Sequence, residues 1–330
     1  MNYPKINYYG NKEKLADWII DHLPINKGTV LDGFSGGGSM SYAFKKHGFQ
    51  VISNDSLYAS FCIAKGLIEN DTHTLPLDLT KQVMAQDVTD KYALYRFLDN
   101  RYYYPQETEE LVHYLEYAEH LKGHDEYLML ALIRRAMIRK LPRSRMDLDW
   151  NTIQLLRDED YSYEKFKRRR AYHNWTFTRH IDENLESYNN AIFSNGLKHT
   201  AYHSDIFDRL KHIDNVDLIY LDPPYPNTLN QYDAFYGLFD DLFDKRIAHY
   251  DLTKSKTFLT YLNDLLQLAK TKTDYVVMSM STKSKPHFSE MEQCMSQFGH
   301  VQTLFKQHDY HFGKRSQKNK EILMILTFND

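Results

Sequence analysis

Short apolar runs alternate with amphipathic segments over the first seventy residues of the chain. The run 29–34 (TVLDGF) is bounded by glycines, as is typical of a buried strand, and 50–55 (QVISND) has the same character. The segments around these strands have apolar positions at helical spacing, and Ser39 is the expected N-cap of the middle one. The predicted helices span 11–23, 39–47 and 57–69. This order predicts a parallel sheet with helices on its faces.

The pattern changes between residues 71 and 196. This segment is rich in tyrosine and charge, has helical periodicity and contains no convincing strand. Its clearest helix is predicted over 128–140, with one apolar and one basic side. Strands resume at 199–204, 216–221, 275–280, 301–306 and 321–328. We therefore expect an α/β fold in which a sheet domain, made of residues 1–70 and 197–330, is interrupted by a mainly helical insertion.

The composition is that of a globular protein without a disulfide framework or a metal site. The 330 residues are 42% hydrophobic, enough for a sizeable core. Cys62 and Cys294 are too few for a disulfide framework or a zinc site, and the sixteen histidines show no ligand spacing. No segment approaches the length of a membrane span, and residues 1–14 lack the apolar run of a secretory signal. We expect a protein of the reducing cytoplasm with no metal and no membrane partner.

Basic residues are distributed unevenly, although the net charge is only −3. Six lysines and arginines between 134 and 145 have no acid among them, and five more lie between 165 and 170. Two such blocks within one segment favour a phosphate-binding surface over solvated helix faces. A weaker third group consists of Lys314, Arg315, Lys318 and Lys320.

The strongest chemical signal is Asp222-Pro223-Pro224-Tyr225, which directly follows the apolar run VDLIYL. Ligands of open parallel sheets bind at the carboxyl ends of the strands, so this tetrapeptide lies where chemistry is expected. Two consecutive prolines stiffen the loop and remove two backbone donors. A carboxylate beside a proline carbonyl suits an amino group with two N–H donors, and Tyr225 offers a flat face for stacking a base.

A second signal is the glycine-rich turn 32–39 (DGFSGGGS) between a strand and a helix. Glycines tolerate positive φ and let a ligand approach the backbone closely. The turn lacks the G-x-G-x-x-G spacing of dinucleotide-binding proteins and the lysine of a P-loop, which favours a cofactor without phosphates. Asp55 ends the next strand, where an acid is suited to hold ribose hydroxyls.

In this order, the motifs resemble those of the α-type (D12 class) DNA adenine-N6 methyltransferases. Residues 8–12 (YYGNK) are similar to the family's first cofactor motif, in which many members carry tryptophan in place of Tyr8. Asp205 falls where the family contacts the cofactor adenine. The other matches are 34–38 (FSGGG) with the F-x-G-x-G loop, Asn54-Asp55 with the ribose-binding acid, 222–225 (DPPY) with the catalytic tetrapeptide, and 321–324 (EILM) with the strand of the closing hairpin.

The resemblance implies a Rossmann-like methyltransferase fold, with a mostly parallel sheet, a C-terminal antiparallel hairpin strand and a helical target-recognition domain inserted over 71–196. It implies S-adenosylmethionine (SAM) as methyl donor, S-adenosylhomocysteine as product, and N6 of an adenine flipped out of double-stranded DNA as acceptor. Cofactor binding is expected from Tyr8, Lys12, Asp32, Phe34, Ser35, Gly36, Gly38, Asp55, Asp205, Ile206 and Asp222. Catalysis is expected from Asp222, Pro223, Pro224 and Tyr225. DNA contacts are expected from Arg134, Arg135, Arg139, Arg143, Lys167, Arg168, Arg169 and Arg170.

The implied mechanism is a direct in-line transfer in which Asp222 and the Pro223 carbonyl accept the two N6 hydrogens while Tyr225 stacks on the base. Because a duplex offers one adenine per event, we expect the enzyme to act as a monomer. It would work in the cytoplasm of a prokaryote or a phage host. The family includes restriction–modification enzymes, so a cognate restriction endonuclease is a further expected partner.

Three other functions fit parts of the pattern. The same pocket suits cytosine N4 in DNA or an amino group in RNA, although cytosine-N4 enzymes more often carry serine in place of Asp222. A catalytically inert DNA-binding protein on this fold would be expected to lose the DPPY loop first. A nicotinamide-dependent oxidoreductase is disfavoured by the glycine spacing.

Overall fold

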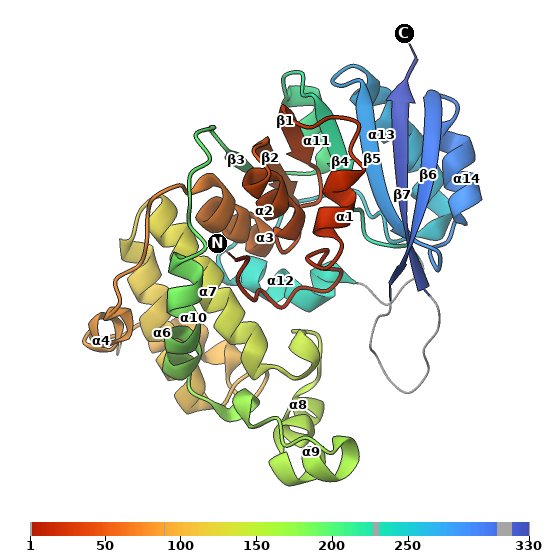
Figure 1. The fold of residues 1–330 in the computed structure, drawn as a ribbon. Helices are drawn as coiled ribbons and strands as arrows, with labels where there is room; N and C mark the ends of the chain where they lie inside the picture. Colours follow the sequence, from red (N-terminus) through yellow and green to blue (C-terminus); the bar gives the residue numbers. More distant parts are fainter. Residues whose placement is uncertain (1, 89, 227–230, 309–318, 330) are drawn as a thin grey trace.

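Seven strands form one mixed sheet in the order β3-β2-β1-β4-β5-β7-β6 (Figure 1). The computed structural model describes residues 2–88, 90–226, 231–308 and 319–329. The strands are β1 (Thr29–Asp32), β2 (Gln50–Asp55), β3 (Thr200–His203), β4 (Leu218–Leu221), β5 (Tyr275–Ser281), β6 (Gly299–His308) and β7 (Asn319–Phe328). Strand β7 runs antiparallel to both of its neighbours, and the other pairings are parallel. The predicted mostly parallel sheet with a C-terminal antiparallel hairpin strand is therefore confirmed.

Both faces of the sheet are buried because successive side chains of a strand point to opposite sides. In β4, Leu218 and Tyr220 join one apolar cluster, and Ile219 and Leu221 join a second one. Helices α1 (Ala16–Asp21), α2 (Ser39–Lys46) and α3 (Tyr58–Ala64) contribute to the first cluster. Helices α11 (Ile206–His212), α13 (Ser255–Lys270) and α14 (Phe288–Met295) contribute to the second. This is a doubly wound, Rossmann-like arrangement.

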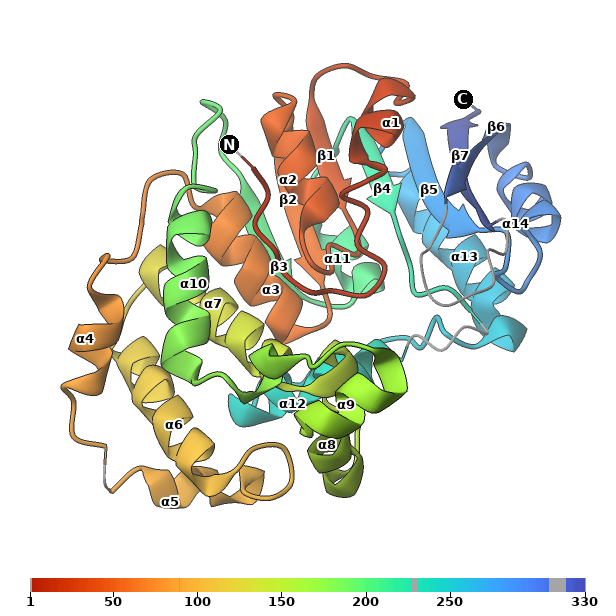
Figure 2. The same ribbon diagram turned by 60° about the horizontal axis from the view of Figure 1, so that its bottom comes forward.

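Between residues 79 and 189, the elements that the structure describes are all helices. The α-helices among them lie on the side of α3 that faces away from the sheet (Figures 1 and 2). They are α4 (Leu79–Met84), α5 (Tyr92–Tyr95), α6 (Pro105–His120), α7 (His124–Lys140), α8 (Trp150–Arg157), α9 (Glu159–Phe166) and α10 (Phe177–Asn189). In Figure 1, α8 and α9 form the outer tip of this layer. Helix α12 (Tyr232–Leu242) follows the DPPY loop and packs between the layer and α3.

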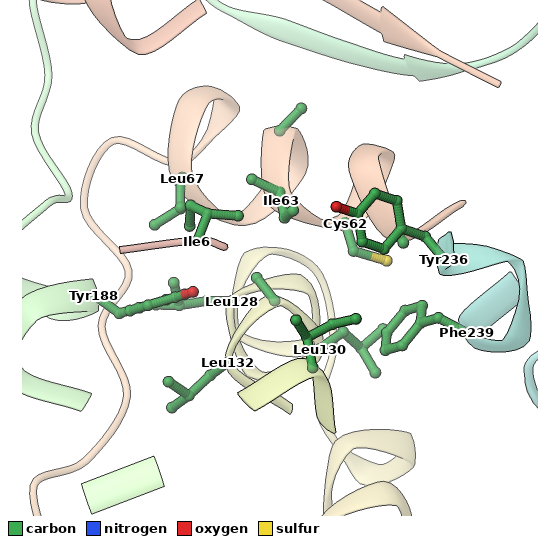
Figure 3. Packing of buried hydrophobic residues seen from close by; sticks show 14 of the residues in the cluster. Ile6, Cys62, Ile63, Leu67, Leu128, Leu130, Leu132, Tyr188, Tyr236 and Phe239 are labelled. Atoms are coloured by element: carbon green, nitrogen blue, oxygen red, sulfur yellow. The ribbon is translucent and has the colours of Figure 1, made fainter. Parts of the chain in front are cut away.

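The helical layer has no separate core, because helix α7 shares its apolar contacts with the sheet domain. Figure 3 shows Leu128, Leu130 and Leu132 of α7 among side chains of α3, α10 and α12. The chain after α3 continues as a π-helical turn, Lys65–Glu69, that lies against α7. A Cβ on Gly66 would lie 2.8 Å from the Leu128 backbone, so glycine permits this close approach.

Two local predictions are corrected by the structure. Helix α7 has no basic solvent side: almost all of its residues from Leu128 to Lys140 are buried, because helices surround it. Residue Ser39 is not the N-cap of α2, since Gly38 holds that position with φ 82°. The Ser39 hydroxyl instead accepts a hydrogen bond from the backbone N–H of Lys12 at 3.1 Å.

Among the described residues, no helix combines the length and apolar character needed to span a bilayer.

Candidate active site at the carboxyl ends of the strands

A cavity of about 480 Å³ opens at the carboxyl ends of β1, β2, β3 and β4. Parallel strands of a doubly wound sheet bring their carboxyl ends to one edge, which is why segments far apart in sequence meet here. The cavity is lined by residues from 8–11, 32–40, 54–57, 204–206, 220–224, 231–234 and 249–254. The glycine turn and the DPPY loop, predicted separately, therefore share one cavity.

The glycine turn is shaped by Asp55 and Tyr8. The backbone N–H of Gly36, a residue with φ 52°, donates to Asp55 Oδ2 at 2.8 Å. The other carboxylate oxygen of Asp55 accepts the N–H of Leu57 at 2.9 Å. Side chains at positions 36 and 37 would lie within 2.8 Å of Tyr8, so the glycines let this ring close over the turn.

Tyr8 belongs to a stack of aromatic rings beside the cavity. Its ring centroid lies 4.7 Å from that of Tyr236 and 5.5 Å from that of Tyr232, both on α12. The guanidinium of Arg134 lies over Tyr236 at 4.7 Å and over Tyr8 at 5.6 Å. Helices α7 and α12 thus hold the ring that covers the glycine turn.

Asp222 meets a buried network behind the cavity. The ammonium of Lys12 lies 2.9 Å from Asp222 Oδ1 and donates to the Tyr225 hydroxyl at 2.7 Å. The Tyr225 hydroxyl donates to Glu321 Oε1 at 2.6 Å, and the Ser279 hydroxyl donates to the same oxygen at 2.8 Å. The network joins the N-terminal segment, the DPPY loop and strands β5 and β7.

Burial dominates the ionisation of this network. It raises the pKa of Asp222 to about 6; the Lys12 ammonium opposes this rise and the Glu321 carboxylate adds to it. Although burial by itself lowers the pKa of Lys12, the carboxylates of Asp222 and Glu321 raise it well above its usual value. Lys12 therefore stays charged, and Asp222 titrates close to neutral pH.

Two further carboxyls line the glycine-turn end of the cavity. Burial raises the pKa of Asp32 to about 7, while the Ser41 hydroxyl, which donates to Asp32 Oδ2 at 2.6 Å, opposes the rise. The other oxygen of Asp32 has no hydrogen-bond partner among the described residues. Burial also raises the pKa of Asp55 to about 6, and the two backbone donors oppose it.

Most of the residues predicted to bind the cofactor lie around this cavity. The predicted residues that line it are Tyr8, Asp32, Phe34, Ser35, Gly36, Asp55, Asp205, Ile206 and Asp222. Lys12 and Gly38 are outside the lining, since Lys12 is enclosed behind Asp222 and Gly38 is the N-cap of α2. Asp205 has a local role: it caps α11 through the N–H of Phe207 and accepts the N–H of Tyr250 at 2.9 Å. Pro224 lines the cavity, whereas Pro223 and Tyr225 do not.

Several lining residues were missed by the sequence analysis. Asp233 and His249 face each other at 3.2 Å, and the Asp233 carboxylate raises the pKa of His249 to about 9. They belong to the segments 231–234 and 249–254, which carry no motif, and their proximity to DPPY in sequence was the only available signal. Glu321 was noted as part of a strand but given no role at the site.

For Arg134 and Arg135 of α7, the prediction of DNA contacts is wrong. Arg134 is fully buried and donates to the carbonyl of Ile6 at 2.6 Å. Arg135 is also buried, and burial lowers its pKa to about 10. Both lie on a helix enclosed by its neighbours, so neither side chain faces DNA.

The other basic candidates lie nearer the surface. Arg139 is half-buried with its guanidinium 3.6 Å above the Tyr172 ring, and Arg170 is half-buried over Phe166. The exposed candidates are Arg143, Lys167, Arg168 and Arg169. Of the third basic group, Lys320 is exposed, while Lys314, Arg315 and Lys318 lie outside the described residues.

The chain is similar to a known protein family over most of its length. Residues 8–302 match the model of the D12 class N6 adenine-specific DNA methyltransferases. The chain is 39% identical to the Type II methyltransferase M2.HphI of Haemophilus parahaemolyticus, over 98% of both chains. It is 24% identical to the modification methylase StsI of Streptococcus sanguinis, over 98% of this chain and 51% of that protein.

The solved structures resemble the chain only distantly. A Streptococcus mutans protein assigned as a SAM-dependent methyltransferase is 10% identical with a TM-score of 0.40, over 97% of this chain and 49% of that one. The family match therefore rests on sequence.

Proposed function

Since the chain belongs to the D12 class of N6 adenine-specific DNA methyltransferases, we propose that SAM and the flipped adenine meet in the cavity between the glycine turn and the DPPY loop. Membership of this family favours adenine N6 as the methyl acceptor over cytosine N4 or an amino group in RNA. It also favours a methyltransferase over a catalytically inert DNA-binding protein or an oxidoreductase. One observation carries the proposal: Asp222 and Gly36 line the same cavity. A base and a methyl donor held there would be close enough for direct transfer.

The residues of this cavity fit SAM. Asp32 offers a carboxylate oxygen that is buried and unpaired among the described residues, which suits a ligand carrying a positive charge and N–H donors. The hydroxyl of Ser35 is likewise without a partner among those residues. The ring of Tyr8 covers the turn, and Asp55, which lines the cavity, would accept hydrogen bonds from the ribose hydroxyls. When bound, SAM supplies an electrophilic methyl group on a sulfonium centre.

We assign the acceptor chemistry to the DPPY loop. An ionised Asp222 and the Pro223 carbonyl would accept the two N6 hydrogens, which concentrates the nitrogen lone pair toward the methyl group. Asp222 is 17% exposed, so it is accessible from the cavity while remaining largely desolvated. Tyr225 would stack on the extruded base, with its hydroxyl held by Glu321. The protein supplies position and charge, and no covalent intermediate is needed.

We propose that residues 71–196 recognise the target DNA, while 1–70 and 197–330 form the catalytic domain. The support is the exposed group Lys167, Arg168 and Arg169 after α9, together with Arg143 after α7. Exposed cations of this kind bind phosphates. The carbonyl of Arg143 accepts a hydrogen bond from the hydroxyl of Tyr9, a cavity-lining residue, so this loop lies next to the cavity.

The relatives suggest the biological setting. M2.HphI is a Type II methyltransferase and StsI a modification methylase. We propose that this chain protects DNA against a cognate restriction endonuclease, acts as a monomer and works in the cytoplasm. Light scattering of the purified protein, with and without duplex DNA, tests whether it is monomeric.

Replacing Asp222 tests the proposed function directly. We expect Asp222→Ala to lower kcat by about a hundredfold or more, because the N6 hydrogens lose their charged acceptor. Methyl transfer from labelled SAM to duplex DNA is measured, and sequencing of the product identifies the methylated adenine. The matched control is Asp264→Ala on the exposed side of α13, which should retain wild-type activity. Full activity in Asp222→Ala would refute the assigned role.

A further inference from the structure

Glu321 is a second carboxylate of the catalytic centre that the DPPY motif does not include. It lies on β7, is 1% exposed and has three partners at one oxygen: Tyr225, Ser279 and the Lys12 ammonium at 3.3 Å. Its other oxygen has no hydrogen-bond partner among the described residues. A buried carboxylate so close to the active site requires an explanation, since burial of an ion is costly unless it is paired.

The position of Lys12 supplies that explanation. Its ammonium lies 2.9 Å from Asp222 and 3.3 Å from Glu321, so the two carboxylates share one cation. While Lys12 is paired with Asp222, it occupies an acceptor oxygen that the adenine amine would use. Glu321 offers the Lys12 ammonium a second carboxylate, which the ammonium can reach by a short movement. Lys12 therefore remains protonated when it leaves Asp222.

We propose that Glu321 is a positioning residue: it takes over the Lys12 ammonium when the adenine amine binds, and so frees Asp222 to accept the amine. The proposal rests on the role of Asp222 proposed above. The same Glu321 oxygen accepts a hydrogen bond from the Tyr225 hydroxyl. The movement of Lys12 from Asp222 to Glu321 would therefore also affect the orientation of the Tyr225 ring. Strand β7 fixes Glu321 through its pairing with β5, where Ser279 also donates to it.

The charges around Asp222 predict a signature in the pH profile. Asp222 faces Lys12 from the N-terminal segment, Glu321 from β7, Tyr225 from its own loop, and Asp32 and Tyr220 from β1 and β4. The Glu321 charge raises the pKa of Asp222 and the Lys12 charge lowers it. Removing the Glu321 charge should therefore lower the pH at which Asp222 ionises, even though catalysis becomes slower.

The test is Glu321→Gln, which keeps the shape of the side chain and removes its charge. We expect kcat to fall about tenfold or more, because Asp222 is then the only carboxylate partner of Lys12 among the described residues, while the KM for SAM changes by less than about twofold. The acidic limb of the activity profile should move to lower pH. Unchanged kcat, or a lower kcat with an unmoved acidic limb, would overturn the proposal.

Matched variants separate positioning from folding. Glu321→Asp should recover part of the lost kcat, since it restores the charge. Ser279→Ala removes one donor to Glu321 and keeps the charge, so it should lower kcat less and leave the acidic limb in place. Glu292→Gln on α14, whose carboxylate accepts the Thr303 hydroxyl outside the cavity lining, should behave as wild type.

The outcomes also distinguish this inference from the proposed function. If the wild-type protein does not methylate duplex DNA, the proposed function fails. If the wild type is active and Glu321→Gln equals it, only the role of Glu321 fails. If Glu321→Gln does not fold, as judged by its thermal unfolding, the Ser279→Ala and Glu321→Asp variants decide: wild-type kcat in both would overturn the proposal.

Discussion

At the scale of single residues, the site is a set of carboxyl groups whose burial disfavours the ionised form. Asp222 must be ionised to accept an amine, and its pKa is raised to about 6. Activity should therefore be present above that pH and be lost as the pH falls through it. The same burial that would strengthen the proposed binding of an amine to Asp222 also raises its pKa to about 6.

The Asp32 carboxyl gives a prediction for stability without ligand. Its pKa is about 7 in the folded protein against 3.8 for an unperturbed group, so the native state binds more protons than the unfolded state between these values. Its contribution to stability is fully present below about pH 4 and is lost as the pH rises through 7. Asp32→Asn should raise the free energy of unfolding at pH 8 by about 1–4 kcal/mol and change it little at pH 4.

Thermal unfolding of cofactor-free protein at the two pH values measures this effect. Asp208→Asn, at an exposed position on α11, serves as the control and should show no such pH dependence. A stability difference at pH 4 as large as that at pH 8 would contradict the assignment to burial of charge.

At the scale of elements, arginines of the two basic blocks have opposite surroundings. Arg134 holds the N-terminal segment through the carbonyl of Ile6 and supports the ring of Tyr8, whereas Arg168 is exposed beyond α9. The first is a structural residue that reaches the site through Tyr8. The second is available to phosphates.

A pair of alanine variants tests this difference. Arg134→Ala should lower the free energy of unfolding by about 2–4 kcal/mol, because it leaves a cavity and unpaired carbonyls in the core. Arg168→Ala should change the free energy of unfolding by less than about 0.5 kcal/mol. It should instead lower the slope of log affinity for DNA against log salt concentration by about one, because one phosphate contact is lost. Denaturant unfolding and salt-dependent DNA binding are the measurements, and equal stability of the two variants would refute the distinction.

At the scale of the whole molecule, the helical insertion and the sheet form one structure. The apolar cluster on one face of the sheet continues through α3 into α7 and α10 (Figure 3), and it also includes residues of α6. The DNA contacts proposed for the helical layer would thus be connected by packed side chains to the aromatic stack around Tyr8. A division of the chain into functional domains does not correspond to a division of its core.

A single unfolding transition is the expected consequence. Calorimetry of the whole chain should show one cooperative event, because the shared core leaves no element of the helical layer with its own apolar support. Saturating SAM should shift this whole event upward. Two resolved transitions, with only one responding to SAM, would contradict the shared core.

The pattern of the sequence determined the sheet and the chemical identity of the site. Buried parallel strands appear as continuous apolar runs, and chemistry collects where those runs end. The runs 29–34 and 216–221 are therefore sufficient to locate both the glycine turn and the DPPY loop, which line one cavity. These are local signals, because each depends on neighbouring residues of the chain.

Only the tertiary structure decided which charged residues are inside. Arg134 and Lys140 belong to a basic block in the sequence, yet both are buried because α7 lies between other helices. No local pattern encodes how three other residues reach the site: Asp233 is brought there by helix α12, His249 by a loop and Glu321 by strand pairing. Burial and charge pairing depend on what other segments bring into contact, and that is a property of the assembled fold.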